Sequence, residues 1–571
     1  MSGFAIFAEA NKNPTVMIEI CCKNNKITET IEEGRTLFQI MDRFNLKMEY
    51  KPICAIVNNQ IRDLNYVLTE NSTVWYLDIT TASVRRIYAQ GVLILFAKAL
   101  KDLYPQVAIT DTTSMTYGIW CSVTHNDSVA DIDIQSVQEH MQELVKAGLP
   151  IKKHRDFTEK VIEILNRNGR TDAANLLETT GSIYSYYYSL EDYSDSYFGI
   201  MPVNTDALEL FQLKKDHNGV LILVPDRYDC KKIEPCCNQD KMFAINNELT
   251  QWQKTVGISN IGDLNKAGKE GKSATIINVS EALQNKKFVN IADTVHNLRS
   301  SGERPVKMIL IAGPSSSGKT TFSKKLQIQL LANNITPKIL SLDDYYKERG
   351  TGPVDENGQL DFESLHALDL DQLGKDLNSI IEGKEVKVPT YNFAAGKQEY
   401  LGNTVQLKDN QVLIVEGIHA LNPELTKAIP DKYKFNIFVS ALTSLRIDNH
   451  NYIHPTDNRL LRRILRDYQY RGTSAVETIG RWPSVRAGED KWILPYQERA
   501  DVMVNSALLF ELAVLKDRII PILENVPENC IEYVTAGHLL RFLRLFNSIT
   551  EKQIPQNSLL REFIGGSSFH Y

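Results

Sequence analysis

Short apolar runs separated by helix-like segments mark the C-terminal half of the chain. The runs cover residues 308–312, 338–342, 412–415 and 435–439. Strands of a parallel sheet are buried on both faces, so they appear as continuous apolar runs of this kind. The pattern predicts that residues 301–571 form an α/β domain with a largely parallel sheet covered by helices.

The first 85 residues have a different pattern, in which short β-like runs surround one helix-like segment. Residues 16–20 and 26–30 predict a hairpin, residues 36–44 predict a helix, and residues 55–57 and 74–77 predict further strands. This order is typical of a compact β-grasp domain.

Two further regions lie between these domains. Residues 86–240 open with an apolar helix at 90–104 and continue as a mixed α+β pattern, and residues 241–300 form a mainly helical connector. An amphipathic packing helix is predicted at 536–550. The final stretch REFIGGSS is interpreted as a tail that docks on the body of the protein, and no chemistry is assigned to it.

Composition narrows the class of protein. At 571 residues the chain is too long for one core, and a formal net charge of −6 with a pI near 6.1 argues against a protein that coats polyanions. The sequence has no apolar run of about 20 residues and no basic region before its first apolar stretch, so we expect a cytoplasmic protein without a membrane span. The eight cysteines, which include the pairs Cys21-Cys22 and Cys236-Cys237, form neither a CxxC metal pattern nor a disulfide framework.

The first apolar run leads directly into a phosphate-binding loop. The sequence GPSSSGKTT follows residue 312 with the spacing GxxxxGK[ST]. Glycines let backbone N–H groups point at nucleotide phosphates, the lysine reaches the outer phosphates, and the hydroxyl after it ligates Mg²⁺. The predicted nucleotide-binding residues are Gly313, Pro314, Ser315, Ser316, Ser317, Gly318, Lys319, Thr320 and Thr321.

Acidic residues follow two of the other apolar runs. Asp343 and Asp344 come directly after residue 342, and Glu416 comes directly after residue 415. Because ligands bind beyond the carboxyl ends of parallel strands, these carboxylates should lie beside the phosphate-binding loop. A carboxylate there accepts the proton of an attacking hydroxyl or helps to hold Mg²⁺. We predict both roles for Asp343, with Asp344 in reserve, and a metal role for Glu416 together with Thr320.

A basic segment, RLLRRILRDYQYRG, comes after the last apolar run. A helix presents four of its arginines as one stripe at i, i+3, i+4 and i+7, namely Arg459, Arg462, Arg463 and Arg466. A guanidinium that closes over the moving phosphoryl group stabilises its charge. We predict that Arg462, Arg466 and Arg471 act with Lys319 in catalysis. A solvated basic helix face is the alternative, and spacing alone does not rank the arginines.

Residues 311–501 resemble the uridine kinase and phosphoribulokinase family. The motifs that carry the resemblance are GPSSSGKTT, SLDDYYK, VPTYNF, VEGIHAL, RRILRDYQYRG and LPYQERADV, in that order. The resemblance implies a kinase in which Asp343 is the catalytic base for a sugar 5′-hydroxyl. It also implies substrate contacts from Tyr346, Glu363, Tyr391 and Arg486. The histidine that helps to read the pyrimidine in that family aligns with Gly396, which leaves the identity of the base open.

The front of the chain resembles two domains of threonyl-tRNA synthetases. The segment IRDLNYVLTENSTVWYLD is similar to their TGS domain, and QGVLILFAKALKDLYP is similar to the first helix of their second additional domain. That domain carries His-x-x-x-His and Cys-x-x-x-His pairs, whereas the matching positions here hold Gln90, Ile94, Tyr197 and Met201. The departure implies a shell retained for packing, regulation or ligand binding. The whole order resembles a three-part nucleoside kinase group often labelled uridine kinase.

Together these features predict an ATP- and Mg²⁺-dependent kinase for the 5′-hydroxyl of a nucleoside, with uridine or cytidine as the first expectation and a homo-oligomer as the expected state. A kinase for a purine nucleoside or a sugar phosphate is the alternative in the same class. A nucleotide-switched RNA-binding regulatory protein is the alternative from another class. Aromatic side chains can stack bases, and such a cluster is formed by Tyr184, Tyr186, Tyr187 and Tyr188. The acidic residues that follow it, Glu191 and Asp192, disfavour RNA binding.

Overall fold

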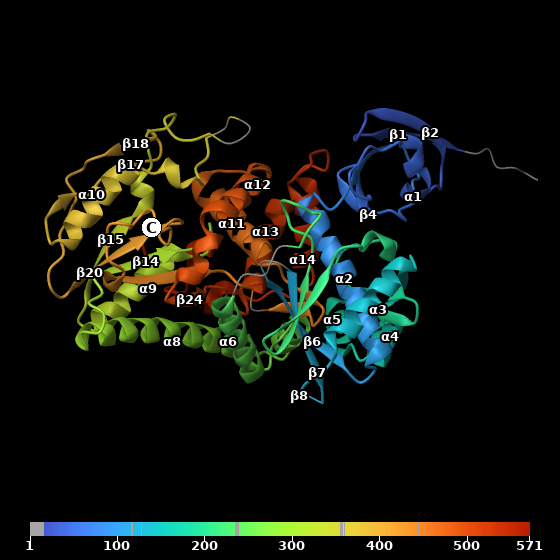
Figure 1. Cartoon of the computed structure of the whole chain (residues 1–571), viewed down its shortest axis with the longest axis horizontal. Coiled ribbons are helices and arrows are strands. Elements are labelled where there is room, and N and C mark those ends of the chain that lie inside the picture. The colour runs from blue at the N-terminus through green and yellow to red at the C-terminus, as the bar shows by residue number, and fades with distance from the viewer. Residues whose placement is uncertain are drawn as a thin grey trace, which may run out of the picture.

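The computed structural model describes residues 16–570 except 116–117, 127, 234–238, 355–357, 359 and 444. In Figure 1 a small sheet module lies at one end of the molecule and the sheet that carries the phosphate-binding loop lies at the other. No helix among the described residues has the length and apolarity needed to cross a membrane. The predictions on the N-terminal stretch and on Cys236 and Cys237 lie outside the described residues.

The C-terminal sheet is parallel and has the strand order β15-β20-β14-β21-β24. Its strands are β14 (Met308–Ala312), β15 (Thr336–Ser341), β20 (Gln411–Glu416), β21 (Lys434–Ser440) and β24 (Val502–Asn505). The four apolar runs of the sequence form four of these strands, which confirms the predicted parallel sheet. The sequence pattern missed β24, because VMVN is a run of only 4 residues.

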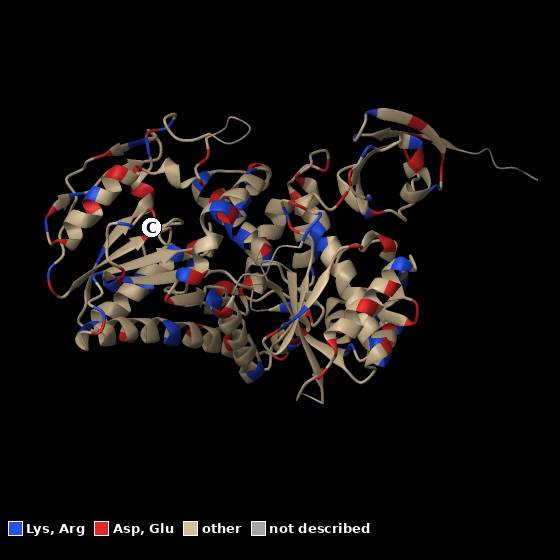
Figure 2. Ribbon diagram, in the orientation of Figure 1, with Lys and Arg blue, Asp and Glu red and all other residues tan. Residues whose placement is uncertain are grey.

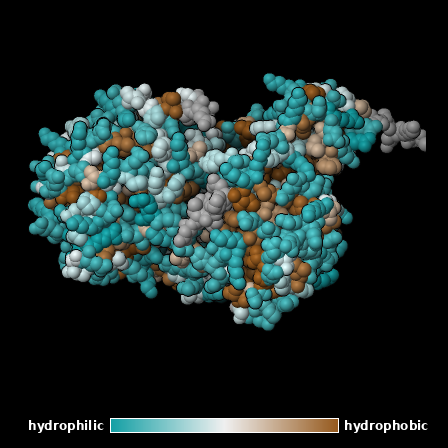
Figure 3. All heavy atoms as spheres, viewed as in Figure 1, coloured by the Kyte–Doolittle hydropathy of each residue, from teal (hydrophilic) through white to brown (hydrophobic). Residues whose placement is uncertain are grey.

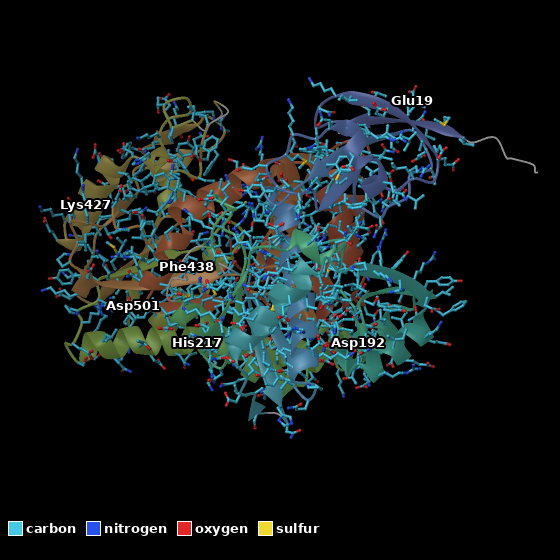
Figure 4. The ribbon with its side chains drawn as sticks, turned by 45° about the vertical axis from the view of Figure 1, so that its right-hand side comes forward. Glu19, Asp192, His217, Lys427, Phe438 and Asp501 are labelled. Carbon is cyan, nitrogen blue, oxygen red and sulfur yellow. The ribbon has the colours of Figure 1, made fainter. Side chains whose placement is uncertain are left out.

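Helices cover both faces of this sheet, and the predicted connector supplies some of them. Side chains of α8 (Ser273–Ser300) and α9 (Lys319–Ala332) pack on one face. Side chains of α6 (Asp240–Val256) and α10 (Leu370–Ile381) pack on the other face, where Phe438 of β21, labelled in Figure 4, joins the same cluster. The connector also contains α7 (Ile261–Lys269). Residues 241–300 are therefore helical, as predicted, and contribute to the core of the C-terminal sheet.

A helical layer completes the C-terminal region. Its helices are α11 (Pro455–Arg471), α12 (Ala475–Trp492), α13 (Glu511–Glu524), α14 (Tyr533–Leu543) and the short α15 (Arg561–Ile564). They share one apolar core with α7 and with the hairpin of β22 (Arg446–Asp448) and β23 (Asn451–Tyr452). The C-terminal tail thus docks on the body of the protein, as predicted, through buried Leu559, Leu560 and Phe563.

The first 77 residues form a separate mixed sheet with the order β2-β1-β5-β3-β4. Its elements are β1 (Met17–Cys22), β2 (Ile27–Glu32), α1 (Leu37–Ile40), β3 (Cys54–Val57), β4 (Gln60–Asp63) and β5 (Ser72–Leu77). The predicted hairpin, helix and further strands are confirmed, with Thr36 and Gln39 forming a capping box at the start of α1. Membership of the TGS family stays a prediction.

The region that follows is built around α2 (Ala82–Leu103), which begins at Ala82 rather than at the predicted Gln90. Two antiparallel sheets lie around it, with the orders β11-β10-β9 and β12-β13-β7-β6. The strands are β6 (Ala108–Met115), β7 (Gly118–His125), β8 (Ser128–Val129), β9 (Ile151–Phe157), β10 (Tyr184–Leu190), β11 (Tyr193–Asp195), β12 (Gln212–Asp216) and β13 (Gly219–Leu223). The helices are α3 (Ile134–Lys146), α4 (Thr158–Arg167) and α5 (Thr171–Thr180). The mixed α+β pattern is confirmed, whereas the likeness to a synthetase domain stays a prediction.

Surface properties agree with a protein of mixed charge. In Figure 2 blue and red segments are interspersed along the ribbon, in line with the small net charge. Figure 3 shows a mainly hydrophilic face, with hydrophobic patches gathered toward its right-hand side.

Candidate active site

The phosphate-binding loop joins β14 to α9 and is held in shape by close packing. Gly313 lies against the carbonyl of Val439, so a side chain at this position would collide with β21. Gly318 has a φ of +82°, a conformation that residues with a Cβ rarely adopt. Lys319 begins α9, and its Nζ donates to the Pro314 carbonyl at 3.2 Å. The predicted strand, loop and helix are therefore all present.

The hydroxyl of Thr320 meets the carboxylate of Glu416 at the end of β20. Thr320 Oγ1 donates to Glu416 Oε1 at 3.1 Å, and Glu416 Oε2 is buried without a hydrogen-bond partner among the described residues. Burial raises the pKa of Glu416 to about 7, although nearby Lys319 opposes the shift. These oxygens fit Mg²⁺, which prefers oxygen ligands. Among the described residues no three His, Cys, Asp or Glu side chains cluster to hold a metal alone, so phosphate and water would complete the shell.

Asp343 lies at the same edge of the sheet, in the 3₁₀ turn Leu342–Tyr345 that follows β15. The Ser341 hydroxyl accepts the Asp343 N–H at 3.2 Å and fixes the start of the turn. Surrounding protein raises the pKa of Asp343 through desolvation, while Lys319, Arg471 and Arg466 oppose this effect. The carboxylate is solvent-exposed and lies within electrostatic reach of three cations.

Its neighbour Asp344 makes a different contact. Asp344 Oδ1 accepts the backbone N–H of Tyr391 at 3.1 Å and so ties the turn to the hairpin of β17 (Thr390–Asn392) and β18 (Lys397–Glu399). The reserve candidate thus holds the loop that carries Tyr391.

The predicted acceptor residues come together beside Asp343. The rings of Tyr346 and Tyr391 lie 5.9 Å apart, and the Tyr346 hydroxyl donates to the Phe362 carbonyl at 3.0 Å. Asp343 and Glu363 both raise the pKa of Tyr346, so all three groups are close. A side chain in place of Gly488 on α12 would collide with Glu363. Burial raises the pKa of Glu363 to about 7, opposed mainly by Arg463.

At the position of the expected base-reading histidine, the chain makes a tight turn. Gly396 has a φ of +71°, and a Cβ there would lie 2.8 Å from Arg349 Cβ. Arg349 donates its backbone N–H to the Gly396 carbonyl at 2.7 Å and its guanidinium to the Phe393 carbonyl at 2.8 Å. Sequence analysis missed Arg349, because its approach to residues 393–396 depends on the fold of the intervening loop.

The basic stripe of α11 faces the phosphate-binding loop, but its arginines differ from one another. Arg462 was predicted to act on the phosphoryl group, and the structure corrects this. Its side chain is 0% exposed, its guanidinium donates to both oxygens of Glu511 at 2.5 and 2.6 Å, and Phe563 covers it. Arg459 is likewise buried against Glu489. These arginines secure α11 to the body of the protein, which also excludes a solvated helix face.

Three other arginines remain nearer to the reacting groups. Arg463 Nη1 donates to Ser315 Oγ at 3.1 Å and lies close enough to Glu363 to oppose its pKa shift. Arg466 and Arg471 both lie near Asp343 and make weaker pairs with Asp467. Arg463 belongs to the predicted stripe but was not chosen, because spacing does not show which arginine reaches the loop.

Arg486 lies behind the site. It pairs with Glu489 and Asp490, and Glu489 in turn binds Arg459. The structure therefore connects Arg486 to the acceptor residues only through this buried group of charges.

In the front region, the positions that lack His and Cys lie together in the core. Gln90 donates its side-chain amide to the Phe198 carbonyl at 3.1 Å. The other three positions, Ile94, Tyr197 and Met201, are buried in one apolar cluster. These contacts agree with the expected packing role.

The tyrosine cluster has neighbours that the sequence did not reveal. Cross-strand pairing with β9 places Lys153 Nζ 4.7 Å from the ring centre of Tyr186, and the Arg155 guanidinium 4.5 Å from that of Tyr184. The acidic residue Asp192, labelled in Figure 4, binds Lys98 instead at 3.1 Å. The charges nearest to the exposed tyrosines are therefore basic, contrary to the expectation from chain order.

Comparisons with known proteins match the part of the chain that carries this site. Residues 308–509 match the Phosphoribulokinase / Uridine kinase family. The chain is 33% identical over 198 residues to the uridine kinases of Staphylococcus aureus strains JH9 and Newman, a match that covers 34% of this chain and 86% of each relative. Among solved structures, D-glycerate 3-kinase from Cryptococcus neoformans var. grubii is 13% identical, with 50% of this chain and 90% of that chain covered and a TM-score of 0.20. The chain belongs to the phosphoribulokinase/uridine kinase family and is a phosphotransferase with an alcohol acceptor.

Proposed function

We propose that this protein transfers the γ-phosphoryl group of ATP to the 5′-hydroxyl of a nucleoside, uridine or cytidine. The observation that carries the proposal is the position of Asp343, which lies near Lys319, Arg466 and Arg471 at the carboxyl edge of the sheet. A carboxylate there can take the proton of the acceptor hydroxyl, while the cations stabilise the charge of the transferred group.

The other residues divide the remaining work. The loop at 313–321 holds the triphosphate, and Thr320 and Glu416 hold Mg²⁺, which neutralises charge on the phosphates when it is bound. Tyr346, Glu363 and Tyr391 orient the nucleoside, with Glu363 accepting hydrogen bonds from ribose hydroxyls. Arg463 is added to the predicted set as a link between loop and acceptor, and Arg486 supports the arginines from behind.

An acceptor panel with labelled ATP tests this function. We expect uridine or cytidine to be phosphorylated at least about tenfold faster than purine nucleosides or sugar phosphates, since unmatched polar groups in the acceptor site penalise other acceptors. Lys319→Met should abolish the signal and thereby assign it to this site. Transfer to a sugar phosphate but to no nucleoside would overturn the proposed acceptor while leaving the kinase chemistry in place.

The acceptor affinity should depend on pH through Glu363. Because the pKa of Glu363 is raised to about 7, the carboxylate that accepts ribose hydroxyls is lost as the pH falls through 7. We expect the nucleoside KM to rise up to about tenfold per pH unit below 7 and to level off above pH 8. Glu363→Gln should give a weaker but nearly flat profile, and identical profiles for the two proteins would contradict this role. The KM for MgATP, measured in parallel, separates the titration of Glu416.

The RNA-binding alternative has one specific observation in its favour. Lys153 and Arg155 lie over the exposed rings of Tyr186 and Tyr184, and interleaved basic and aromatic side chains can bind single-stranded nucleic acid. The two functions differ in what they require of Asp343, because a nucleotide-dependent switch needs nucleotide binding but no catalytic base.

A further inference from the structure

The C-terminal segment of residues 558–564 packs directly against the phosphate-binding loop. A Cβ at Gly318 would lie 2.6 Å from Leu559 Cδ2, so the loop and the segment touch at this glycine. Leu560 and Phe563 are fully buried, and the Arg462 guanidinium lies 4.9 Å from the Phe563 ring centre. The segment is therefore firmly anchored to the same arginine that contacts the loop carbonyl of Ser316.

Glu562 in this segment reaches the N-terminus of α9. Its Oε2 accepts the Thr321 hydroxyl at 2.5 Å and the Thr321 backbone N–H at 3.3 Å. Thr321 is the third residue of α9, and N–H groups in the first turn of a helix have no partner within the helix. In a phosphate-binding loop these are the groups that bind nucleotide phosphates. The carboxylate thus uses a donor that a phosphate would need.

Glu562 also lies in the electrostatic field of the loop lysine. Burial lowers the pKa of Lys319, and Glu416, Asp343 and Glu562 oppose this shift. Glu562 therefore contributes negative charge on the side of the loop where the phosphates bind. A nucleotide brings further negative charge to the same place, and like charges at this distance repel.

On the basis of the proposed ATP binding at residues 313–321, we propose that Glu562 is a competitor for nucleotide phosphate and that a bound nucleotide displaces its carboxylate from Thr321. The backbone of the segment stays in place, because Leu560 and Phe563 anchor it, and only the Glu562 side chain rotates away. The C-terminal segment thereby sets the nucleotide affinity of the enzyme below the value that the loop alone would give.

Calorimetric titration of the full-length protein with ADP and with inorganic pyrophosphate tests this role. Glu562→Gln removes the charge but keeps the shape, and we expect it to bind both probes about tenfold more tightly than the unaltered protein. Glu551→Gln is the matched control, because Glu551 pairs with Arg518 in the same C-terminal region. This control should leave both affinities unchanged, and thermal unfolding of each variant verifies that the fold is intact.

Each outcome bears on the proposal. Equal or weaker binding of ADP to Glu562→Gln, beside normal binding to the unaltered protein, would overturn the role of Glu562 and leave the proposed kinase function standing. A gain for ADP without a gain for pyrophosphate would also overturn it, because competition for phosphate must affect both probes. If neither protein binds ADP, the proposed function itself fails together with this inference.

Discussion

Replacing Asp343 by asparagine should lower kcat by about three orders of magnitude, which is within the range for loss of a general base. The amide keeps the shape of the side chain but cannot take the proton of the acceptor hydroxyl. ATP affinity should stay the same or rise slightly, because a negative charge near Lys319 and Arg466 is removed. Labelled-ATP turnover measures kcat, and calorimetric titration measures ATP binding.

Asp344→Asn is the matched control for this variant. The asparagine Oδ1 can still accept the Tyr391 N–H that Asp344 binds at 3.1 Å, so turnover should fall less than about tenfold. Nearly normal turnover in Asp343→Asn would contradict the role of Asp343 as the base. If that protein binds ATP but has no measurable transfer to any alcohol before substitution, the nucleotide-switched alternative is favoured.

The features that the sequence predicted are those with local causes. The strand β14, the loop and the start of α9 follow from one continuous stretch, because apolar run, glycine spacing and lysine all lie within 14 residues at 308–321. Asp343 and Glu416 could be placed beside the loop because parallel strands bring their carboxyl ends to one edge.

The features that escaped prediction depend on contacts between distant parts of the chain. The spacing of the arginines correctly indicates one helix face, but it does not show that Glu511 binds Arg462 and removes it from the reaction. Glu562 lies more than 200 residues from Thr321 in sequence, and no periodicity connects a tail glutamate to a helix N-terminus. The same limit applies to Tyr186, whose charged neighbour Lys153 comes from another strand.

A second large effect is expected at a buried group of charges that joins the front region to α11. Arg170 donates to Asp172 and Asp195, and to Asp448 of β22 at 2.7 Å. His450, in the same hairpin, contacts Asp195 at 2.6 Å. One arginine therefore neutralises three buried carboxylates, and the hairpin that carries Asp448 leads directly into α11.

Arg170→Met should lower the free energy of unfolding by about 3–5 kcal/mol, because it leaves buried carboxylates without their cation. Burial already raises the pKa of Asp448 to about 6 with Arg170 present, since desolvation outweighs the attraction of the arginine. Without Arg170 the folded-state pKa values rise further above the unfolded values, so stability falls as the pH rises through them. The loss should thus be smaller at pH 5.5 than at pH 8, as measured by urea denaturation.

Arg167→Met provides the comparison that separates this network from a general loss of charge. Arg167 is nearby in sequence, but its side chain is 75% exposed, compared with 6% for Arg170, and it pairs only with exposed Glu163 at 3.2 Å among the printed ion pairs of the described chain. Its removal should change the free energy of unfolding by less than about 0.5 kcal/mol at either pH. Equal losses in the two variants, or a loss in Arg170→Met that does not depend on pH, would show that the buried carboxylates do not need this cation. With the expected result, the charge network fixes the β22–β23 hairpin, and through it α11, against the front region of the protein.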